Sequence, residues 1–238
     1  MNLRLILLFL LSALISCQED NLDDEVLEPL ESLNNGNDNG TDNQKMGTPC
    51  VDGFAGKYPC KGYDLLAHID LSTLGSGQGN DCWGWTDSST GKEYVLMGLD
   101  NGTAFVDINE YTNPILIGKL PTTTENSSWR DIKVYDNHAY IVSEADSHGV
   151  QVFDLTRLRE ANPPENFSPD RVLQTVPTAH NMVVNPDSGY GYVVGTDKKD
   201  DFRGGVHFLD LNNPQSIKFV GGYADAGHSH DAQVVNYR

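Results

Sequence analysis

Short segments of alternating or apolar residues recur along the chain from residue 64 onward, separated by polar, glycine and proline residues. Each interval of about 50 residues contains four such segments, and the third has the pattern Gly-x-x-apolar-apolar-Asp-Ile/Leu. Short alternating or apolar runs between turn residues are typical of β-strands. Four short strands in each unit of roughly 50 residues are typical of a β-propeller blade. The residues that open successive units are spaced 50 apart: Asp81, Asp131, Asn181 and Asp231.

The pattern therefore predicts an all-β fold, a β-propeller of four-stranded blades with three full blades and parts of another. The segment LLAHIDL, residues 65–71, is expected to be a fourth strand without its own first three strands. Because propellers close with roughly four to eight blades, the propeller domain, residues 48–238, is expected to be incomplete at its C-terminus, as in a fragment. First strands are expected at 82–86, 132–136, 182–186 and 232–236, and second strands at 94–96, 140–142 and 192–194. Third strands are expected at 102–108, 149–155 and 205–211, and fourth strands at 115–120, 172–176 and 217–223.

The N-terminus has the features of an export and anchoring signal. Residues 1–16 contain one Arg and an apolar block that is too short for a transmembrane helix, which is typical of a signal peptide. Cys17 follows a small residue at the end of this block and resembles the lipidated Cys of bacterial lipoproteins. Residues 17–47 are rich in Asp, Glu, Asn and Gly and are predicted to form a disordered acidic tether. Gln18-Glu19-Asp20 resembles the surface-export signal of Bacteroidetes lipoproteins, so the predicted location is the outer membrane, at the cell surface or otherwise facing the periplasm.

The net charge limits the class of partner, and the cysteines predict a disulfide. The chain has 34 acidic and 16 basic residues, a net charge of -18, which argues against a nucleic-acid partner because phosphates attract basic surfaces. Export permits disulfides, and Cys50 and Cys60 flank a loop short enough to be closed by one. A Cys50–Cys60 bridge is therefore expected, and Cys82 is expected to be a small buried residue.

Several blocks in order resemble the choice-of-anchor B proteins, which carry LVIVD-type repeats. The resemblance runs from about Cys50 to Arg238, and it implies a secreted or surface-anchored β-propeller that is held here by lipid. It implies no particular reaction. Cys82 departs from the aliphatic residue expected at its position, and the C-terminal part of the family domain is missing. The blocks that carry the resemblance are NDCWGW, GKEYVLMG, SSWRDIKVYDNHAYIVSE, HGVQVFDLTRLR, TAHNMVVNPDSGYGYVVGT and HSHDAQVV.

The aligned repeats gather polar residues at one end of the predicted propeller axis. Imidazoles and carboxylates from neighbouring blades are ligands for a divalent metal, with His180, His228 and His230 as the candidates. The guanidinium of Arg130, at the same end of the axis, instead favours an acidic ligand. The alternative is structural, with an Asp or Asn that accepts backbone hydrogen bonds and a neighbour that completes the network. The candidate binding residues are Arg130, Asp131, His180, Asn181, His228, His230 and Asp231.

Other residues permit both a functional and a structural interpretation. Trp83, Trp85 and Trp129 suit a sugar-binding face or a packed core. The loop that contains Asp197, Asp200 and Asp201 suits a solvated charged loop or, less well, a calcium loop.

The sequence lacks the GxSxG, P-loop, HExxH and CxxC motifs. The predicted function is therefore a non-catalytic binding module for a protein, glycan or acidic ligand, without a cofactor. The alternative is a metal-dependent hydrolase that uses a His/Asp ring, and a third interpretation is that an unclosed propeller has no function.

Overall fold

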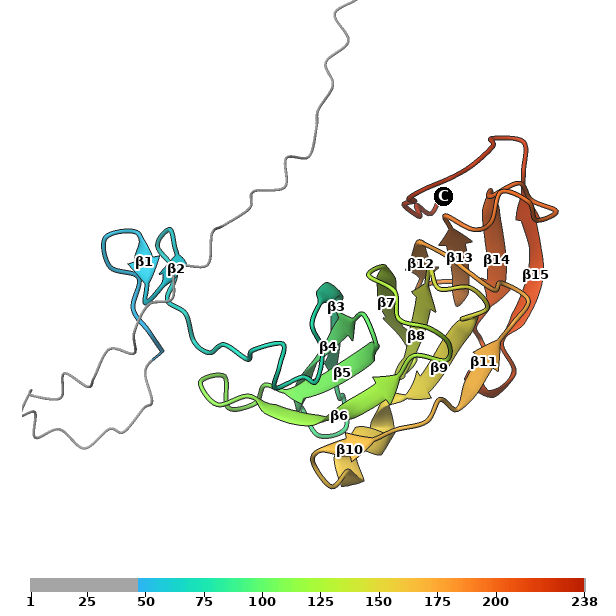
Figure 1. Ribbon diagram of the computed structural model, residues 1–238. Helices are drawn as coiled ribbons and strands as arrows, with labels where there is room; N and C mark the ends of the chain where they lie inside the picture. The colour runs from blue at the N-terminus through green and yellow to red at the C-terminus, as the bar shows by residue number, and fades with distance from the viewer. Residues whose placement is uncertain (1–46, 238) are drawn as a thin grey trace, which may run out of the picture. The chain divides into compact units, whose positions relative to one another are not determined.

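The computed structural model describes residues 47–237. The predicted signal peptide, Cys17 and nearly all of the predicted tether lie outside the described residues. The described part of the chain is all-β, with one small hairpin and three larger sheets (Figure 1). Two short 3-10 helices, Leu155–Glu160 and Pro214–Ser216, interrupt the strands. No helix among residues 47–237 has the length and hydrophobicity of a membrane span.

Each larger sheet contains four strands in antiparallel order, from the first strand to the fourth, and the first sheet has a fifth strand that pairs in parallel at its edge. The turn between β7 and β8 shows how the chain forms such hairpins, because Asp136 and Asn137 both have positive φ, 46° and 58°, as a type I′ turn requires. Sheet 1 contains β3 (Gly79–Thr86), β4 (Glu93–Leu99), β5 (Gly102–Asp107) and β6 (Ile115–Pro121). Sheet 2 contains β7 (Arg130–Tyr135), β8 (His138–Ser143), β9 (Val150–Asp154) and β11 (Arg171–Leu173). Sheet 3 contains β12 (Asn181–Asn185), β13 (Tyr190–Val194), β14 (Val206–Asp210) and β15 (Lys218–Tyr223).

The sheets pack face to face in the order in which they occur along the chain. We call the face of a sheet that points toward the following sheet its leading face, and the opposite face its trailing face. Neighbouring residues of a strand point to opposite faces. Phe105, for example, belongs to the core between sheets 1 and 2, whereas Val106 belongs to a separate apolar cluster on the trailing face of sheet 1.

The two inter-sheet cores have the same construction. Leu96 and Phe105 on the leading face of sheet 1 share a core with Ile132, Ile141 and Phe153 on the trailing face of sheet 2. A second core joins the leading face of sheet 2 to the trailing face of sheet 3: Tyr140, Val150 and Val152 are in the same cluster as Met182, Val193 and Leu209. The sequence repeat is thus a repeat of packing.

The small hairpin, β1 (Phe54–Ala55) and β2 (Tyr58–Pro59), lies before sheet 1 in the sequence. Cys50 and Cys60 form a disulfide around it with a Cα–Cα distance of 5.9 Å, so this prediction is confirmed. Cys82 is free and exposed, which corrects the expectation that it is buried. It occupies the trailing face of sheet 1, at the position equivalent to the fully buried Ile132 and Met182, and no described sheet covers that face.

Three expected strands differ from the structure. Residues 65–71 contain only an isolated bridge from Leu65 to Thr48, and residues 232–236 form no strand, because no described strand lies beside either segment to complete a ladder. The segment expected at 172–176 shortens to β11, which ends at Leu173. Three strands were not expected: β1 and β2 of the small hairpin, and β10 (Glu165–Asn166), which leaves the connection after β9 and pairs in parallel with β6 of sheet 1.

Candidate functional site

Two acidic residues of the repeat join the first strands of neighbouring sheets. Asp81 Oδ2 accepts a hydrogen bond from the backbone N–H of Ile132 at 2.9 Å, and Asp131 Oδ2 accepts one from Met182 at 2.8 Å. In both cases donor and acceptor are 51 residues apart. Satisfying a backbone donor that lies outside any ladder stabilises the contact between sheets. The repeated Asp therefore has a structural function at these two positions.

The same contact is not made after β12. Asn181 Oδ1 is buried and has no hydrogen-bond partner among the described residues, and the N–H of Ala232 bonds instead to Asp231 Oδ1 at 2.8 Å. The segment still runs back toward β12 (Figure 1), where Asn185 Nδ2 donates to Asn236 Oδ1 at 2.8 Å. Asn181 thus does not make the bond to the following segment that Asp81 and Asp131 make.

Asp131 is also in contact with a cation. Lys133 Nζ lies 2.6 Å from Asp131 Oδ1 and 3.9 Å from Asp81 Oδ2. Burial raises the pKa of Asp131 to about 6, with a further contribution from the charge of Asp81, although Lys133 and the Met182 N–H act in the opposite direction. A carboxylate held in this way belongs to the protein interior and is not presented to a ligand.

Arg130 is buried, with 1% of its surface exposed. Its Nε donates to the carbonyl of Leu99 at 3.0 Å, and Nη1 lies 2.9 Å from Nε2 of the fully buried His148. His148 Nδ1 lies 2.7 Å from the carbonyl of Gly149, so Nδ1 carries the proton and Nε2 accepts from Arg130. Burial and the charge of Arg130 lower the pKa of His148 to about 4, and burial lowers the pKa of Arg130 to about 10. The prediction that Arg130 receives an acidic ligand at the surface does not fit this burial.

Trp129, the residue before Arg130, is exposed and belongs to a different group of side chains. Trp129 is 50% exposed, and its ring centroid lies 5.2 Å from that of His180. The His180 ring in turn lies 3.9 Å from that of His230, and His180 Nδ1 lies 2.7 Å from Glu144 Oε1. We call Trp129, Glu144, His180 and His230 the Trp–His cluster.

The end of β8 holds this cluster in place. Ser143 Oγ and the N–H of Glu144 both donate to the carbonyl of Trp129, at 2.9 and 3.2 Å. The N–H of Ala179 donates to the carbonyl of Ser143 at 2.9 Å, which fixes the chain just before His180. Residues immediately before β7 and β12 are thereby brought to the same edge, where Trp129 is 50% exposed and the Glu144 side chain is 40% exposed.

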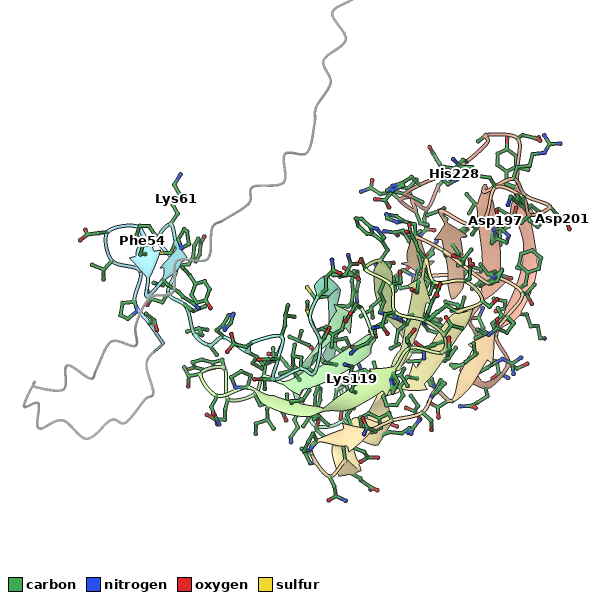
Figure 2. All side chains as sticks on the ribbon, viewed as in Figure 1. Phe54, Lys61, Lys119, Asp197, Asp201 and His228 are labelled. Carbon is green, nitrogen blue, oxygen red and sulfur yellow. A yellow bond between two sulfur atoms is a disulfide. The ribbon has the colours of Figure 1, made fainter. Side chains whose placement is uncertain are left out.

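His228 does not join the other two candidate histidines in one set of ligands. Gly204 lies against its ring, since a Cβ on Gly204 would fall 2.7 Å from His228 Nδ1, and the N–H of Ser229 donates to the Gly204 carbonyl at 3.0 Å. Figure 2 shows His228 at the same end of sheet 3 as Asp197 and Asp201. Within residues 47–237, no three His, Cys, Asp or Glu side chains have the arrangement of a metal site.

The acidic loop 196–204 is organised by its own side chains. Asp200 accepts hydrogen bonds from the N–H of Phe202 at 2.8 Å and from Thr196 Oγ1 at 3.0 Å, and Asp197 accepts one from the N–H of Lys199 at 2.9 Å. These contacts match the interpretation of the loop as an ordinary charged turn.

A pocket of about 460 Å³ lies beside the first strands. Lys133 Nζ lies 4.6 Å from the ring centroid of Trp83, which is half-exposed, and residues 232–234 also line the pocket. Trp85, in contrast, is buried in the core between sheets 1 and 2. Trp129 therefore lies at the surface, Trp83 in the pocket and Trp85 in a core.

Sequence reasoning missed Glu144, His148 and Lys133. None of them recurs at equivalent positions of the three units, so the repeat alignment carried no signal for them.

No protein-family model matches the chain, and no curated protein matches it.

Proposed function

We propose that sheets 1 to 3 are successive blades of a β-propeller and that the Trp–His cluster forms a non-catalytic glycan-binding surface at one end of its axis. Support for the propeller comes from the repeated packing of leading on trailing faces and from the acid-to-amide bonds between first strands. The resemblance to the choice-of-anchor B proteins agrees with this arrangement. The observation that carries the binding proposal is the exposed Trp129 ring beside His180, Glu144 and His230.

The chemistry of the cluster suits a sugar. The C–H face of a pyranose ring packs on an indole, and its hydroxyls require donors and acceptors placed around that indole. The imidazoles of His180 and His230 and the half-exposed carboxylate of Glu144 provide both kinds of group. Arg130 and Asp131 lie next to the cluster but bond to the protein itself, so they take no part in binding.

A glycan array tests this proposal with the full chain solubilised in detergent. Trp129→Ala should weaken the retained glycan roughly tenfold, or about 1.4 kcal/mol. Trp83→Ala is the matched control, because Trp83 is also half-exposed but lines the neighbouring pocket. Loss of binding in the Trp83 variant with full retention in the Trp129 variant would move the site to the pocket. Absence of retention on any glycan would overturn the proposal.

We also propose that the protein is an outer-membrane lipoprotein, attached through an acylated Cys17 and directed to the cell surface. The support is the apolar block followed by Ser16 and Cys17 and the acidic residues after them. Cys17→Ser should release the protein from the membrane fraction. If the variant remains bound to the same extent as the parent, the anchor is a different one.

A further inference from the structure

The small hairpin before sheet 1 is part of a slightly larger antiparallel sheet. Val51 and Phe54 form an isolated bridge, in which the N–H of each donates to the carbonyl of the other, at 2.9 and 3.0 Å. The two residues between them have positive φ, 53° and 88°, as a type I′ turn requires. β1 and β2 then pair with Phe54 opposite Pro59. Residues 51–59 therefore form one small sheet with two tight turns.

One face of this small sheet packs on the protein. Opposite residues of an antiparallel pair lie on the same face, and neighbours along a strand lie on opposite faces. Ala55 pairs with Tyr58 and is only 2% exposed. The ring centroid of the half-buried Tyr58 lies 4.9 Å from that of His68. Ala55 and Tyr58 thus mark the packed face.

The opposite face carries apolar side chains into solvent. Val51 is 63% exposed, Phe54, labelled in Figure 2, is 54% exposed, and Pro59 is also exposed. We call these three residues the exposed hairpin face. The disulfide and a hydrogen bond of 2.8 Å from the Cys60 N–H to the Gly53 carbonyl hold this face in shape. None of its residues belongs to a core cluster within residues 47–237, so the face is available for a contact outside the fold.

The charge around the exposed hairpin face differs from that of the rest of the chain. Residues 48–65 contain two Asp and two Lys, a net charge of zero. Residues 66–238 contain 23 acidic and 12 basic residues, a net charge of -11. The phosphates of a lipid surface repel an acidic protein surface. The neutral hairpin segment is therefore better suited to approach a bilayer than the sheets that follow it.

The size of the face favours a bilayer over a protein partner. A stable protein interface buries about 800 Å² on each partner, which is more than three side chains provide. A bilayer contact needs less, because a few apolar side chains in the headgroup region add to the binding of a protein that lipid already holds. Residues 18–49, which are 32 residues, separate Cys17 from Cys50, so the proposed anchor keeps the hairpin within reach of the bilayer.

We propose that the exposed hairpin face lies in the headgroup region of the bilayer, with Val51 and Phe54 inserted and Lys57 and Lys61 beside the lipid phosphates. The hairpin is then a second, non-covalent contact between the protein and its membrane. The inference rests on the lipoprotein proposal above for the presence of the bilayer. The contact itself depends only on described residues.

Quenching by brominated lipid locates this face relative to the bilayer, because bromine quenches tryptophan only at short range. The full chain, purified in detergent, is reconstituted into phosphatidylcholine vesicles with or without bromine on the acyl chains. Phe54→Trp places a reporter on the face with little change in polarity. Tyr111→Trp is the matched control, since Tyr111 is 58% exposed and lies in the acidic part of the chain. The parent, with its three tryptophans, supplies the emission to subtract.

The emission that Phe54→Trp adds should shift to shorter wavelength in vesicles and lose most of its intensity in the brominated ones. The emission that Tyr111→Trp adds should do neither. Equal quenching in the two variants would overturn the proposal. A shifted but unquenched emission from Phe54→Trp would also overturn it, because protein and not lipid would then cover the face.

Folding and the anchor are checked on the same samples. Near-ultraviolet circular dichroism and the mapped Cys50–Cys60 disulfide verify the fold, and Val51→Trp repeats the measurement on the same face if Phe54→Trp fails this check. Mass spectrometry of the N-terminal peptide tests the acylation of Cys17. Acylation without quenching overturns only the hairpin contact, and quenching without acylation overturns only the proposed anchor.

Discussion

Trp129 and Arg130 are neighbours in the sequence, but they belong to two regions with different chemistry. Arg130, His148 and Asp131 form what we call the inner polar group. Arg130 and His148 bond to each other and to backbone carbonyls, whereas Asp131 accepts from the backbone N–H of Met182 and from Lys133. The Trp–His cluster begins one residue earlier and faces solvent, with Trp129 50% exposed against 1% for Arg130. The polarity of the inner group is needed where the sheets meet, whereas nothing in the described fold requires an exposed indole beside two imidazoles.

This difference teaches how to interpret a repeated polar residue. The repeat alignment placed Arg130 and Asp131 among the binding candidates because both positions are polar in every repeat, with Asn80, His180 and His230 at the position of Arg130. The acid at the second position instead makes a contact between neighbouring sheets, as Asp81 and Asp131 demonstrate. The residues that remain candidates for binding a ligand are the exposed ones of the Trp–His cluster, next to this contact between sheets. The following predictions separate the two regions by stability and by binding.

The largest expected effect is that of Arg130→Ala. The substitution removes a fully buried side chain and leaves the Leu99 carbonyl and His148 Nε2 without a donor. Each buried group left unpaired costs roughly 1–3 kcal/mol, so the free energy of unfolding should fall by about 4 kcal/mol. Urea denaturation measures the change. An Arg130→Ala protein with parental stability and lost glycan binding would mean that the inner group is the binding site.

A second expected effect is a dependence of stability on pH through His148. Its pKa is about 4 in the folded protein and near 6.5 when unfolded. Between these values the unfolded state binds a proton that the folded state does not. Stability should therefore fall as the pH drops from about 6.5 to about 4, by up to roughly 3 kcal/mol.

Comparison with His148→Gln isolates this contribution. Asp131, with its pKa raised to about 6, acts in the opposite direction: the folded state binds its proton more readily, so this group adds stability as the pH falls through 6 toward 3.8. Both proteins contain Asp131, so the difference between their pH profiles reports His148 alone. Parallel profiles from pH 7 to pH 4 would show that His148 is not held neutral.

A smaller effect is expected for Asp131→Ala. The Met182 N–H loses its acceptor and Lys133 loses its closest carboxylate, which should cost about 1–3 kcal/mol. Asp231→Ala is the matched control, because Asp231 is exposed and, within residues 47–237, its side chain bonds only to the next residue. Its effect should lie within about 0.5 kcal/mol. Equal losses in the two variants would contradict the assignment of Asp131 to a contact between sheets.

The strands of the three large sheets, apart from β10, were predictable because each has its own local pattern and turn. The Gly-x-x-apolar-apolar-Asp motif identified β5, β9 and β14 from the sequence alone. Residues 65–71 and 232–236 have the same kind of pattern but form no strand, since a ladder requires a neighbouring strand that a local pattern cannot reveal. The all-β class and the Cys50–Cys60 bridge followed from the sequence.

The candidate site was less predictable. His180 and His230 were recognised from the repeat, and the structure places their rings in contact. Glu144 reaches His180 from the end of β8, a proximity that arises only when sheets 2 and 3 pack. The burial of Arg130 and the exposure of Cys82 likewise depend on which faces of the sheets are covered.

The most direct measurement of the central claim is an NMR titration of the three tryptophan indole N–H signals with a glycan retained on the array, using single Trp→Phe variants for assignment. Trp129 lies at the surface, Trp83 in the pocket and Trp85 in a core, where its Nε1 donates to Asn137 Oδ1 at 3.2 Å. The Trp129 signal should shift with a saturable dependence on glycan concentration, while those of Trp83 and Trp85 stay in place. A saturable shift of Trp83 alone, or none at Trp129, would contradict the account.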